Sequence, residues 1–280
     1  MPAVASANRP VRCRQIVESD LDTLGALFVE GFPFTNREFW DLGLARMAAL
    51  PQIDDLPRFG FVLESEGRLV GVLLTISSRR GDRIISNVSG WYVRASYRVY
   101  SLMLVSVATR LKHVTYLNAS PVKHTWRTLK LTGWKRYSFG RTAIFSALKL
   151  GGGRVHKSIA ESLPAHERKL LQDHSAWNGV SVVCEKSGIT TPFVFKQCSI
   201  TSMKIPVMEL IYCRSEDDFV RCSGALGRYF LLRGRIGFVL DGKMRVGISR
   251  YRPDIEPRFY KGPQPPEFND FAYTERLIFA

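Results

Sequence analysis

The spacing of the predicted elements repeats once along the chain, and this repeat narrows the choice of fold. Hairpin turns are predicted at Gly67 and Gly188, which lie 121 residues apart. A long strand is expected to begin near residue 84 in the first half and near 205 in the second, and a short apolar strand near 114 and 236. The matching offsets indicate a tandem duplication of one pattern of strands and helices.

The length of the chain agrees with two units. Domains cluster at about 100–150 residues, and the chain has 280 residues. A flexible joint is predicted at Gly151–Gly153, because three consecutive glycines oppose regular structure. We therefore expect one domain over residues 1–150 and a second over residues 151–280. The hydrophobic fraction of 45% and the charged fraction of 23% are those of a globular protein.

Apolar periodicity and turn residues predict the order of the elements. In the first half, strands are expected at Val11–Val17, Phe59–Leu63, Leu69–Ile76, Ile84–Val93, Val114–Leu117 and Tyr137–Leu148. Helices are expected there after a cap at Ser19 and at Asn36–Ala49, Tyr100–Leu111 and Pro121–Leu131. In the second half, strands are expected at Val180–Glu185, Phe193–Gln197, Ile205–Cys213, Arg235–Leu240 and Ala272–Phe279, and helices at Ser162–Asp173 and after a cap at Ser215.

Positive charge is concentrated in one part of the chain. The sequence has 40 Lys and Arg against 25 Asp and Glu, a formal net charge of +15. Residues 77–160 carry sixteen of the bases and a single acid, Asp82, so this segment accounts for the whole imbalance. Such a segment attracts anions: a phosphorylated cofactor, a nucleic acid or an acidic surface. We expect the positive field to surround one cleft of the first unit; a solvated basic face is the alternative.

Several classes of protein are disfavoured by what the sequence lacks. No stretch approaches the ~18 apolar residues of a membrane helix, and the start of the chain shows no apolar core of a signal peptide. The five cysteines form no CxxC pair, and the five histidines have no ligand spacing with Cys or Asp. We therefore expect a cytoplasmic protein with reduced thiols, no metal and no membrane partner.

Two stretches of the first half resemble a known family. Residues 91–111, WYVRASYRVYSLMLVSVATRL, resemble the long strand, the Arg/Gln-rich pyrophosphate loop and the following helix of the GNAT-type acyl-CoA N-acyltransferases. Residues 117–138, LNASPVKHTWRTLKLTGWKRYS, are similar to that family's short strand, next helix and "LGF" ending. The resemblance covers Val11–Leu148. It implies an α/β (α+β) fold of tandem GNAT-like units, each with a mixed, mostly antiparallel central sheet flanked by helices.

The resemblance also implies a site for acetyl-CoA or another acyl-CoA. A strand that ends in a tight turn before a helix directs backbone N–H groups at a pyrophosphate. The family's loop resembles R-G-x-G-x-G/A; Arg98 matches, whereas Val99, Ser101 and Met103 replace glycines. The cofactor-binding residues implied in this way are Trp91, Val93, Arg98, Val99, Tyr100, Ser101 and Asn118. An ordinary loop-to-helix junction is the alternative for the loop, and local turn bonding for Asn118.

The acceptor site and the catalytic groups are less defined. Glu30 and Phe32, in the break after the first helix, lie where the resemblance places the acceptor substrate, although a solvated helix-end carboxylate is the alternative for Glu30. The position of the family's tyrosine acid is taken by Leu129, and the long strand carries no carboxylate. His124 and Tyr137 are expected to be structural. No catalytic base is therefore assigned.

The leading hypothesis is an N-acyltransferase that moves an acyl group, with acetyl expected, from acyl-CoA to a small-molecule or peptide amine. The second unit is expected to be degenerate, because three acids, Glu216–Asp218, enter its corresponding helix and repel a pyrophosphate. One alternative is an aminoacyl transferase of the same fold that uses charged tRNA, which the basic segment suits. Another is a GNAT-like binding module without catalysis.

Overall fold

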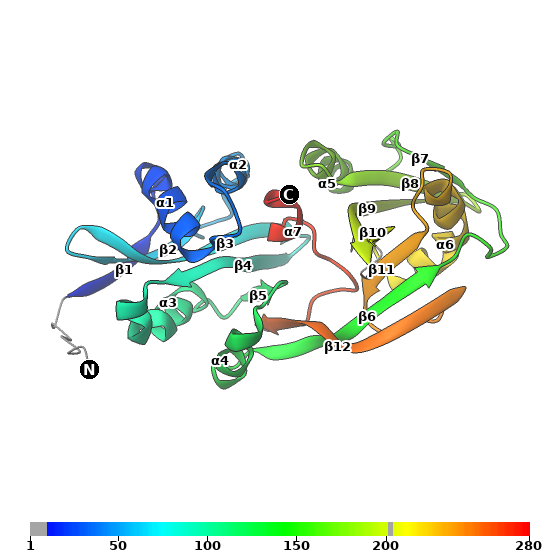
Figure 1. Cartoon of the computed structure of the whole chain (residues 1–280). Helices are drawn as coiled ribbons and strands as arrows, with labels where there is room; N and C mark the ends of the chain where they lie inside the picture. The colour runs from blue at the N-terminus through cyan, green and yellow to red at the C-terminus, as the bar shows by residue number, and fades with distance from the viewer. Residues whose placement is uncertain (1–9, 201–203) are drawn as a thin grey trace. The chain divides into compact units, whose positions relative to one another are not determined.

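The computed structural model describes residues 10–200 and 204–280 (Figure 1). The chain divides into two compact units: residues up to Tyr116 with Phe279, and Leu117–Ile278 with Ala280. Residues 1–9, on which the expectation about a signal peptide rests, lie outside the described residues. Within the described ranges, no helix has the length and apolar character needed to cross a membrane. The expected division at residue 150, between an acyl-CoA-binding domain and a degenerate second domain, stays a prediction.

The first unit is a sheet with helices on both faces. Its strand order is β1-β2-β3-β4-β5, and β1 to β4 pair antiparallel. Helices α1 and α2 lie over one face and α3 over the other (Figure 1). The elements are β1 (Val11–Gln15), η1 (Glu18–Asp20), α1 (Leu21–Gly31), α2 (Arg37–Ala48), β2 (Gly60–Ser65), β3 (Arg68–Arg80), β4 (Arg83–Val93), η2 (Ala95–Tyr100), α3 (Ser101–Ala108) and β5 (Val114–Asn118).

Local signals account for most boundaries in this unit. The β2–β3 turn falls at Glu66-Gly67, where both residues have positive φ, 52° and 73°, as a tight hairpin requires. Asn36 caps α2, since its side chain accepts a hydrogen bond from the Phe39 N–H at 2.9 Å. The predicted cap at Ser19 is wrong. Asp20 instead accepts from the Val17 N–H at 2.9 Å, and the short 3₁₀ turn η1 delays the start of α1 to Leu21.

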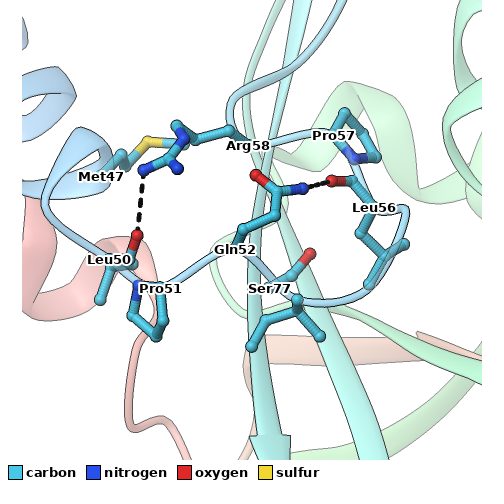
Figure 2. Close-up of a pocket in the computed structure, with 9 residues that line it drawn as sticks. Met47, Leu50, Pro51, Gln52, Leu56, Pro57, Arg58 and Ser77 are labelled. Carbon is cyan, nitrogen blue, oxygen red and sulfur yellow. Dashed lines mark hydrogen bonds between the residues drawn. The ribbon is translucent and has the colours of Figure 1, made fainter.

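Side chains of the link between α2 and β2 donate hydrogen bonds to backbone carbonyls of the link and of the end of α2 (Figure 2). The Arg58 guanidinium donates to the carbonyl oxygens of Ala48 and Leu50 at 2.6 and 3.1 Å, and the Gln52 amide donates to the Leu56 carbonyl. These side chains satisfy backbone groups that no strand or helix uses. The enclosed cavity measures only about 10 Å³, which is room for a single water molecule.

In the second unit, hydrogen-bonded strands follow one another in the order β7-β8-β9-β10-β11-β6-β12. The pair β10–β11 is parallel, and the remaining neighbours are antiparallel. Its strands are β6 (Lys135–Phe145), β7 (Arg154–His156), β8 (Val180–Lys186), β9 (Ile189–Ile200), β10 (Ile205–Tyr212), β11 (Gly237–Asp241) and β12 (Ile248–Lys261). Its helices are η3 (Lys123–Thr125), α4 (Trp126–Leu131), α5 (Ala165–Ala176), α6 (Glu216–Leu231) and α7 (Glu275–Ile278).

Two buried clusters cover opposite faces of the sheet strands in the second unit. Cys184 and Phe195 pack with residues of α6, whereas their neighbours Val183 and Val194 pack with Leu170 and Leu171 of α5. Successive strand residues point to opposite faces, so α6 covers one face and α5 the other. Both units thus have a mostly antiparallel sheet flanked by helices, as expected from the sequence.

The end of the second unit differs from expectation. The predicted strand Ala272–Phe279 is wrong, because Glu275–Ile278 form the short helix α7. The last strand is β12, which the sequence analysis missed. It pairs along β6 with register shifts near Pro253 and Arg258, where its two interior prolines, Pro253 and Pro257, interrupt the ladder.

Candidate active site

Strand β4 carries a β-bulge near its carboxyl end. Ser89 lies opposite Leu74 of β3 and Tyr92 opposite Val72, so two residues, Gly90 and Trp91, oppose only Leu73. Gly90 has φ of 56°, a conformation that glycine adopts without strain. A bulge bends its strand and redirects the following side chains. Trp91 and Val93, both predicted cofactor contacts, lie at and just beyond this bend.

The carboxyl end of α1 packs directly on β4 beyond the bulge. A Cβ atom at Gly31 would overlap the Tyr92 ring, so glycine permits the close approach. Phe32 follows, with its ring centroid 5.1 Å from that of Trp40 and 6.3 Å from that of Tyr92. Phe32 therefore belongs to an aromatic cluster that joins the α1–α2 link to β4.

Glu30, in the last turn of α1, is held by two residues that flank Val93. The Arg94 Nη2 atom lies 2.8 Å from Glu30 Oε2, and Arg94 Nε lies 3.1 Å from both carboxylate oxygens. The Tyr92 hydroxyl donates to Glu30 Oε1 at 3.0 Å. Hydrogen bonds from Arg94 hold the pKa of the Glu30 carboxyl below its ordinary value. A carboxylate with a lowered pKa is a weaker proton acceptor, so we do not assign Glu30 as a base.

The predicted pyrophosphate loop is helical. The 3₁₀ helix η2 runs directly into α3; the Tyr97 N–H donates to the Arg94 carbonyl at 2.9 Å, and the Ser101 N–H donates to the Arg98 carbonyl. Residues 94–101, all within the described part of the chain, include no positive φ. Glycines in the family's loop allow the backbone to approach a phosphate closely. Here the Ser101 N–H is instead used within the chain.

Side chains of the loop nevertheless suit a phosphate-bearing ligand. Arg98 is exposed and has no ion pair among the described residues. Val99 is 78% exposed, so its side chain points into solvent, and Tyr100 and Ser101 are half-buried. An acyl-CoA pyrophosphate would therefore rely here on guanidinium groups, which bind phosphate through charge-assisted hydrogen bonds, more than on backbone N–H groups.

The remaining predicted residues fall in the second unit. Asn118 ends β5 and is buried, as is Leu129 on α4. Burial raises the pKa of the Tyr137 hydroxyl far above its ordinary value, which agrees with a structural role. His124 is exposed on η3. Over the described ranges, no three His, Cys, Asp or Glu side chains gather in a group that could hold a metal ion.

The basic segment does not surround one cleft, so that expectation is wrong. Arg79 and Arg83 flank the β3–β4 turn, whereas Arg94 and Arg98 follow the other end of β4. The 11 residues of β4 separate the two groups by roughly 36 Å at strand rise. The bases from Lys123 onward belong to the second unit.

The sequence analysis missed Tyr92 and Arg94 as members of this site. Both lie inside the stretch that resembles the family, but neither occupies a signature position. Their partner Glu30 is 64 residues from Arg94, and a pair so far apart leaves no local pattern. Only the packing of α1 on β4 brings the three side chains together.

Gly31 offers a direct test of this packing. We expect Gly31→Ala to lower the free energy of unfolding by about 1–3 kcal/mol, because the added methyl must displace the Tyr92 ring. Urea denaturation followed by circular dichroism measures the change. Gly67→Ala, where open space surrounds the Cβ but φ is +73°, separates backbone strain from overlap. A smaller loss at Gly31 than at Gly67 would contradict close packing of α1 on Tyr92.

Comparison with known proteins gives a clear result for the fold and none for the sequence. No model of a known protein family matches the sequence, and no curated protein matches it as a relative. Among solved structures, a GCN5-related N-acetyltransferase from Anabaena variabilis superposes with a TM-score of 0.61 at 8% identity, over 90% of this chain and 72% of that one.

Two further structures agree. A GCN5-related N-acetyltransferase from Kribbella flavida matches with a TM-score of 0.55 at 12% identity, over 90% of this chain and 71% of that one. A putative acetyltransferase from Pyrococcus horikoshii matches with a TM-score of 0.51 at 13% identity, over 94% and 93%. The fold implied by the two sequence stretches is confirmed: this chain has the fold of the GNAT superfamily.

Proposed function

We propose that the first unit is an acyl-CoA-dependent N-acyltransferase that acts on an amine. The observation that carries the proposal is the bulge at Gly90 and Trp91, which bends β4 immediately before the junction bearing Arg98. The bent strand supports an added extended ligand along Trp91–Val93, and Arg98 supplies positive charge for its pyrophosphate. The similar structures from Anabaena variabilis and Kribbella flavida are both named N-acetyltransferases.

The proposal assigns binding roles to residues of this chain. The backbone at Trp91 and Val93 would hold the pantetheine arm, and Arg98 with the neighbouring Val99–Ser101 would hold the pyrophosphate. Asn118 stays a predicted contact to the arm. When bound, acyl-CoA supplies a thioester, so that transfer forms a C–N bond to the acceptor, breaks the C–S bond and moves one proton from the amine to the thiolate. Acetyl is the acyl group we propose.

The acceptor is proposed to enter beside the α1–α2 link. Phe32 and the aromatic cluster around it offer an apolar wall, and Glu30 would offer a negative charge for an amine when its ion pair with Arg94 opens. A small-molecule or peptide amine fits this combination. We further propose that the second unit is a degenerate copy that does not bind cofactor.

A second candidate function is a GNAT-like binding module without catalysis. The helical path of η2 favours it, because the Ser101 N–H is donated to the Arg98 carbonyl and the loop lacks the glycines of an open anion cradle. The absence of a carboxylate from β4 points the same way.

Calorimetry with acetyl-CoA distinguishes the two candidates. Charge-assisted hydrogen bonds contribute about 1.5–3 kcal/mol, so we expect Arg98→Ala to weaken acetyl-CoA binding roughly ten- to a hundredfold. Arg110→Ala is the matched control, since Arg110 is exposed and follows the far end of α3. Wild-type protein that shows neither heat nor a thermal shift with millimolar acetyl-CoA would refute the enzyme and leave the binding module.

A further inference from the structure

Two arginines of the first unit follow the carboxyl end of β4, but only one of them is free to bind an anion. Arg94 comes directly after the last residue of β4, and Arg98 lies four residues further on, in η2. Glu30 neutralises Arg94 through the contacts of 2.8 and 3.1 Å described above. Arg98, in contrast, is exposed and has no carboxylate partner in the part of the chain that the structure describes.

We propose that Arg94 is a second anion-binding side chain of the first unit, and that Glu30 is an internal competitor which occupies it until a phosphate group displaces the carboxylate. The identity of the ligand, an acyl-CoA pyrophosphate, rests on the proposed function. The competition itself requires only a multivalent phosphate anion.

The geometry permits such an exchange. The side chains of Glu30 and Arg94 are 44% and 37% exposed, and partly exposed ion pairs are weak enough to break at small cost. A guanidinium binds carboxylate and phosphate oxygens through the same planar fork of donors. After displacement, Glu30 would return to solvent, so no buried charge is left unpaired.

The exchange also connects the anion site to the α1–α2 link. Glu30 immediately precedes Gly31 and Phe32. The Thr35 hydroxyl donates to the Phe32 carbonyl at 2.7 Å, and the Trp40 indole N–H donates to Thr35 Oγ1 at 2.8 Å. These bonds hold the link itself, so release of Glu30 would remove only the tie from the last turn of α1 to Tyr92 and Arg94. Binding of the phosphate-bearing acyl donor would in this way change the contacts of Glu30, beside the proposed acceptor side.

The test compares Glu30→Gln with wild type, using inorganic pyrophosphate and acetyl-CoA as separate probes in calorimetry. Removing the carboxylate frees Arg94 and abolishes repulsion of the anion, so we expect both probes to bind roughly fivefold or more tightly. Glu38→Gln is the matched control: it removes the same charge from α2 of the same unit, where Glu38 is exposed and has no ion pair among the described residues. We expect this control to change the affinity less than twofold.

A double variant isolates the pair. In an Arg94→Gln background, Glu30→Gln should lose most of its effect, because no guanidinium remains to be released. Tyr92→Phe keeps the ion pair and should change pyrophosphate affinity little. If Glu30→Gln raised the affinity for the probes equally with and without Arg94, the competition would be overturned. Simple repulsion between the Glu30 carboxylate and the anion would then explain the effect.

The two probes separate this inference from the proposed function. Tighter pyrophosphate binding by Glu30→Gln, together with no acetyl-CoA binding by any variant, supports the competition and refutes the acyltransferase. Acetyl-CoA binding that Glu30→Gln leaves unchanged or weakens supports the acyltransferase and refutes the competition. Failure of both probes with every variant refutes both.

Discussion

Arg258→Ala is expected to lower the free energy of unfolding by about 3–5 kcal/mol, the cost of removing one partner from a buried ion pair. Arg258 lies on β12 of the second unit with only 1% of its side chain exposed. Its Nε donates to Asp241 Oδ2 at 2.9 Å, and its Nη2 donates to Glu256 Oε2 at 3.1 Å. The Ala119 carbonyl accepts a further hydrogen bond. The substitution leaves these acceptors without their cationic partner.

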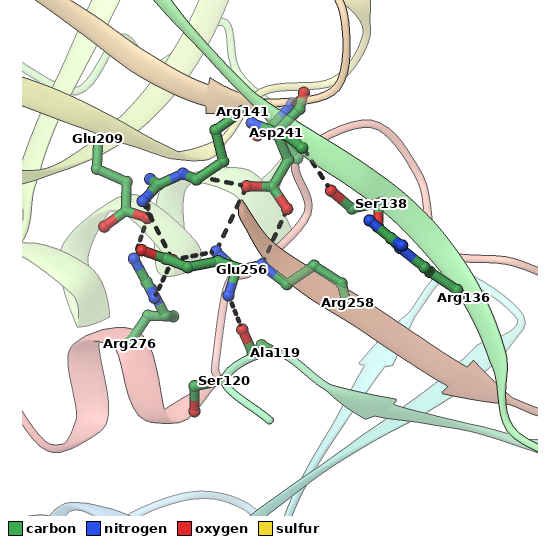
Figure 3. A network of polar contacts seen from close by, with 12 residues as sticks. Ala119, Ser120, Arg136, Ser138, Arg141, Glu209, Asp241, Glu256, Arg258 and Arg276 are labelled. Atoms are coloured by element: carbon green, nitrogen blue, oxygen red, sulfur yellow. Dashed lines mark hydrogen bonds and ion pairs between the residues drawn. The ribbon is translucent and has the colours of Figure 1, made fainter. Parts of the chain in front are cut away.

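Arg258 belongs to a larger network of alternating charges (Figure 3). Arg141 of β6 lies 2.6 Å from Glu209 and 3.1 Å from Glu256, and Arg276 of α7 pairs with Glu209. Three arginines thus face three carboxylates, so the formal charges cancel. The network joins β6, β10, β11, β12 and α7, which come from widely separated parts of the second unit's sequence. Its disruption should therefore destabilise the whole second unit.

Chemical denaturation measured by circular dichroism tests this expectation. Arg252→Ala is the matched control, because Arg252 is an exposed arginine on the same strand and should change stability by no more than about 0.5 kcal/mol. Arg258→Met retains much of the side-chain volume and should still be destabilising, since the carboxylates remain unpaired. A loss below about 1 kcal/mol for both Arg258 variants would contradict the importance of the network.

The sequence predicted those parts of the fold that local chemistry determines. The hairpins at Gly67 and Gly188 were found because a tight turn needs residues with positive φ, and both glycines have it. The cap at Ser215 is confirmed by its hydrogen bond from the Asp218 N–H at 3.2 Å. Long apolar strands such as β4 were found because their composition leaves few alternatives.

Elements whose partners are distant in sequence were missed. Strand β12 contains Arg250, Arg252 and two prolines, so its sequence reads as a loop. It is a strand because β6 offers hydrogen bonds along its length. The apolar run near Ala272 was predicted as a strand, yet Thr274 turns the chain: its hydroxyl donates to the Phe271 carbonyl at 2.7 Å, and α7 follows.

The residues of the candidate site also differ in whether a local sequence pattern reveals them. Arg98 could be proposed from the sequence, because a basic residue between a strand and a helix is a local pattern. The engagement of Glu30 by Arg94 and Tyr92 could not, because it depends on how closely Gly31 approaches β4. The helical course of η2 was also missed, since the replacement of glycines indicates only that an open loop is unfavourable.

Asn269→Ala is expected to lower the free energy of unfolding by about 2–4 kcal/mol. The Asn269 side chain accepts from the Asp241 N–H at 2.8 Å and donates to the Asp241 carbonyl at 3.1 Å. Both residues are buried. Removing the amide leaves a buried donor and a buried acceptor unpaired, at about 1–3 kcal/mol each. Gln172→Ala, at an exposed position of α5, is the control and should change stability little.

The same side chain bears on how many cofactors the chain can bind. Asn269 is bonded to the last residue of β11, and the Phe271 N–H donates to the Ile211 carbonyl of β10 at 2.8 Å. The segment Asn269–Phe271 therefore bridges the carboxyl ends of the two parallel strands with backbone and amide groups of the chain itself. By the repeat predicted from the sequence, this position would correspond to that of the cofactor arm proposed for β4. Glu216, Asp217 and Asp218 in the first turn of α6 also oppose a pyrophosphate there. We therefore expect titration calorimetry to give at most one acetyl-CoA per chain, for wild type and Asn269→Ala alike. Two acetyl-CoA molecules per chain in either protein would contradict the expectation that the second unit does not bind the cofactor.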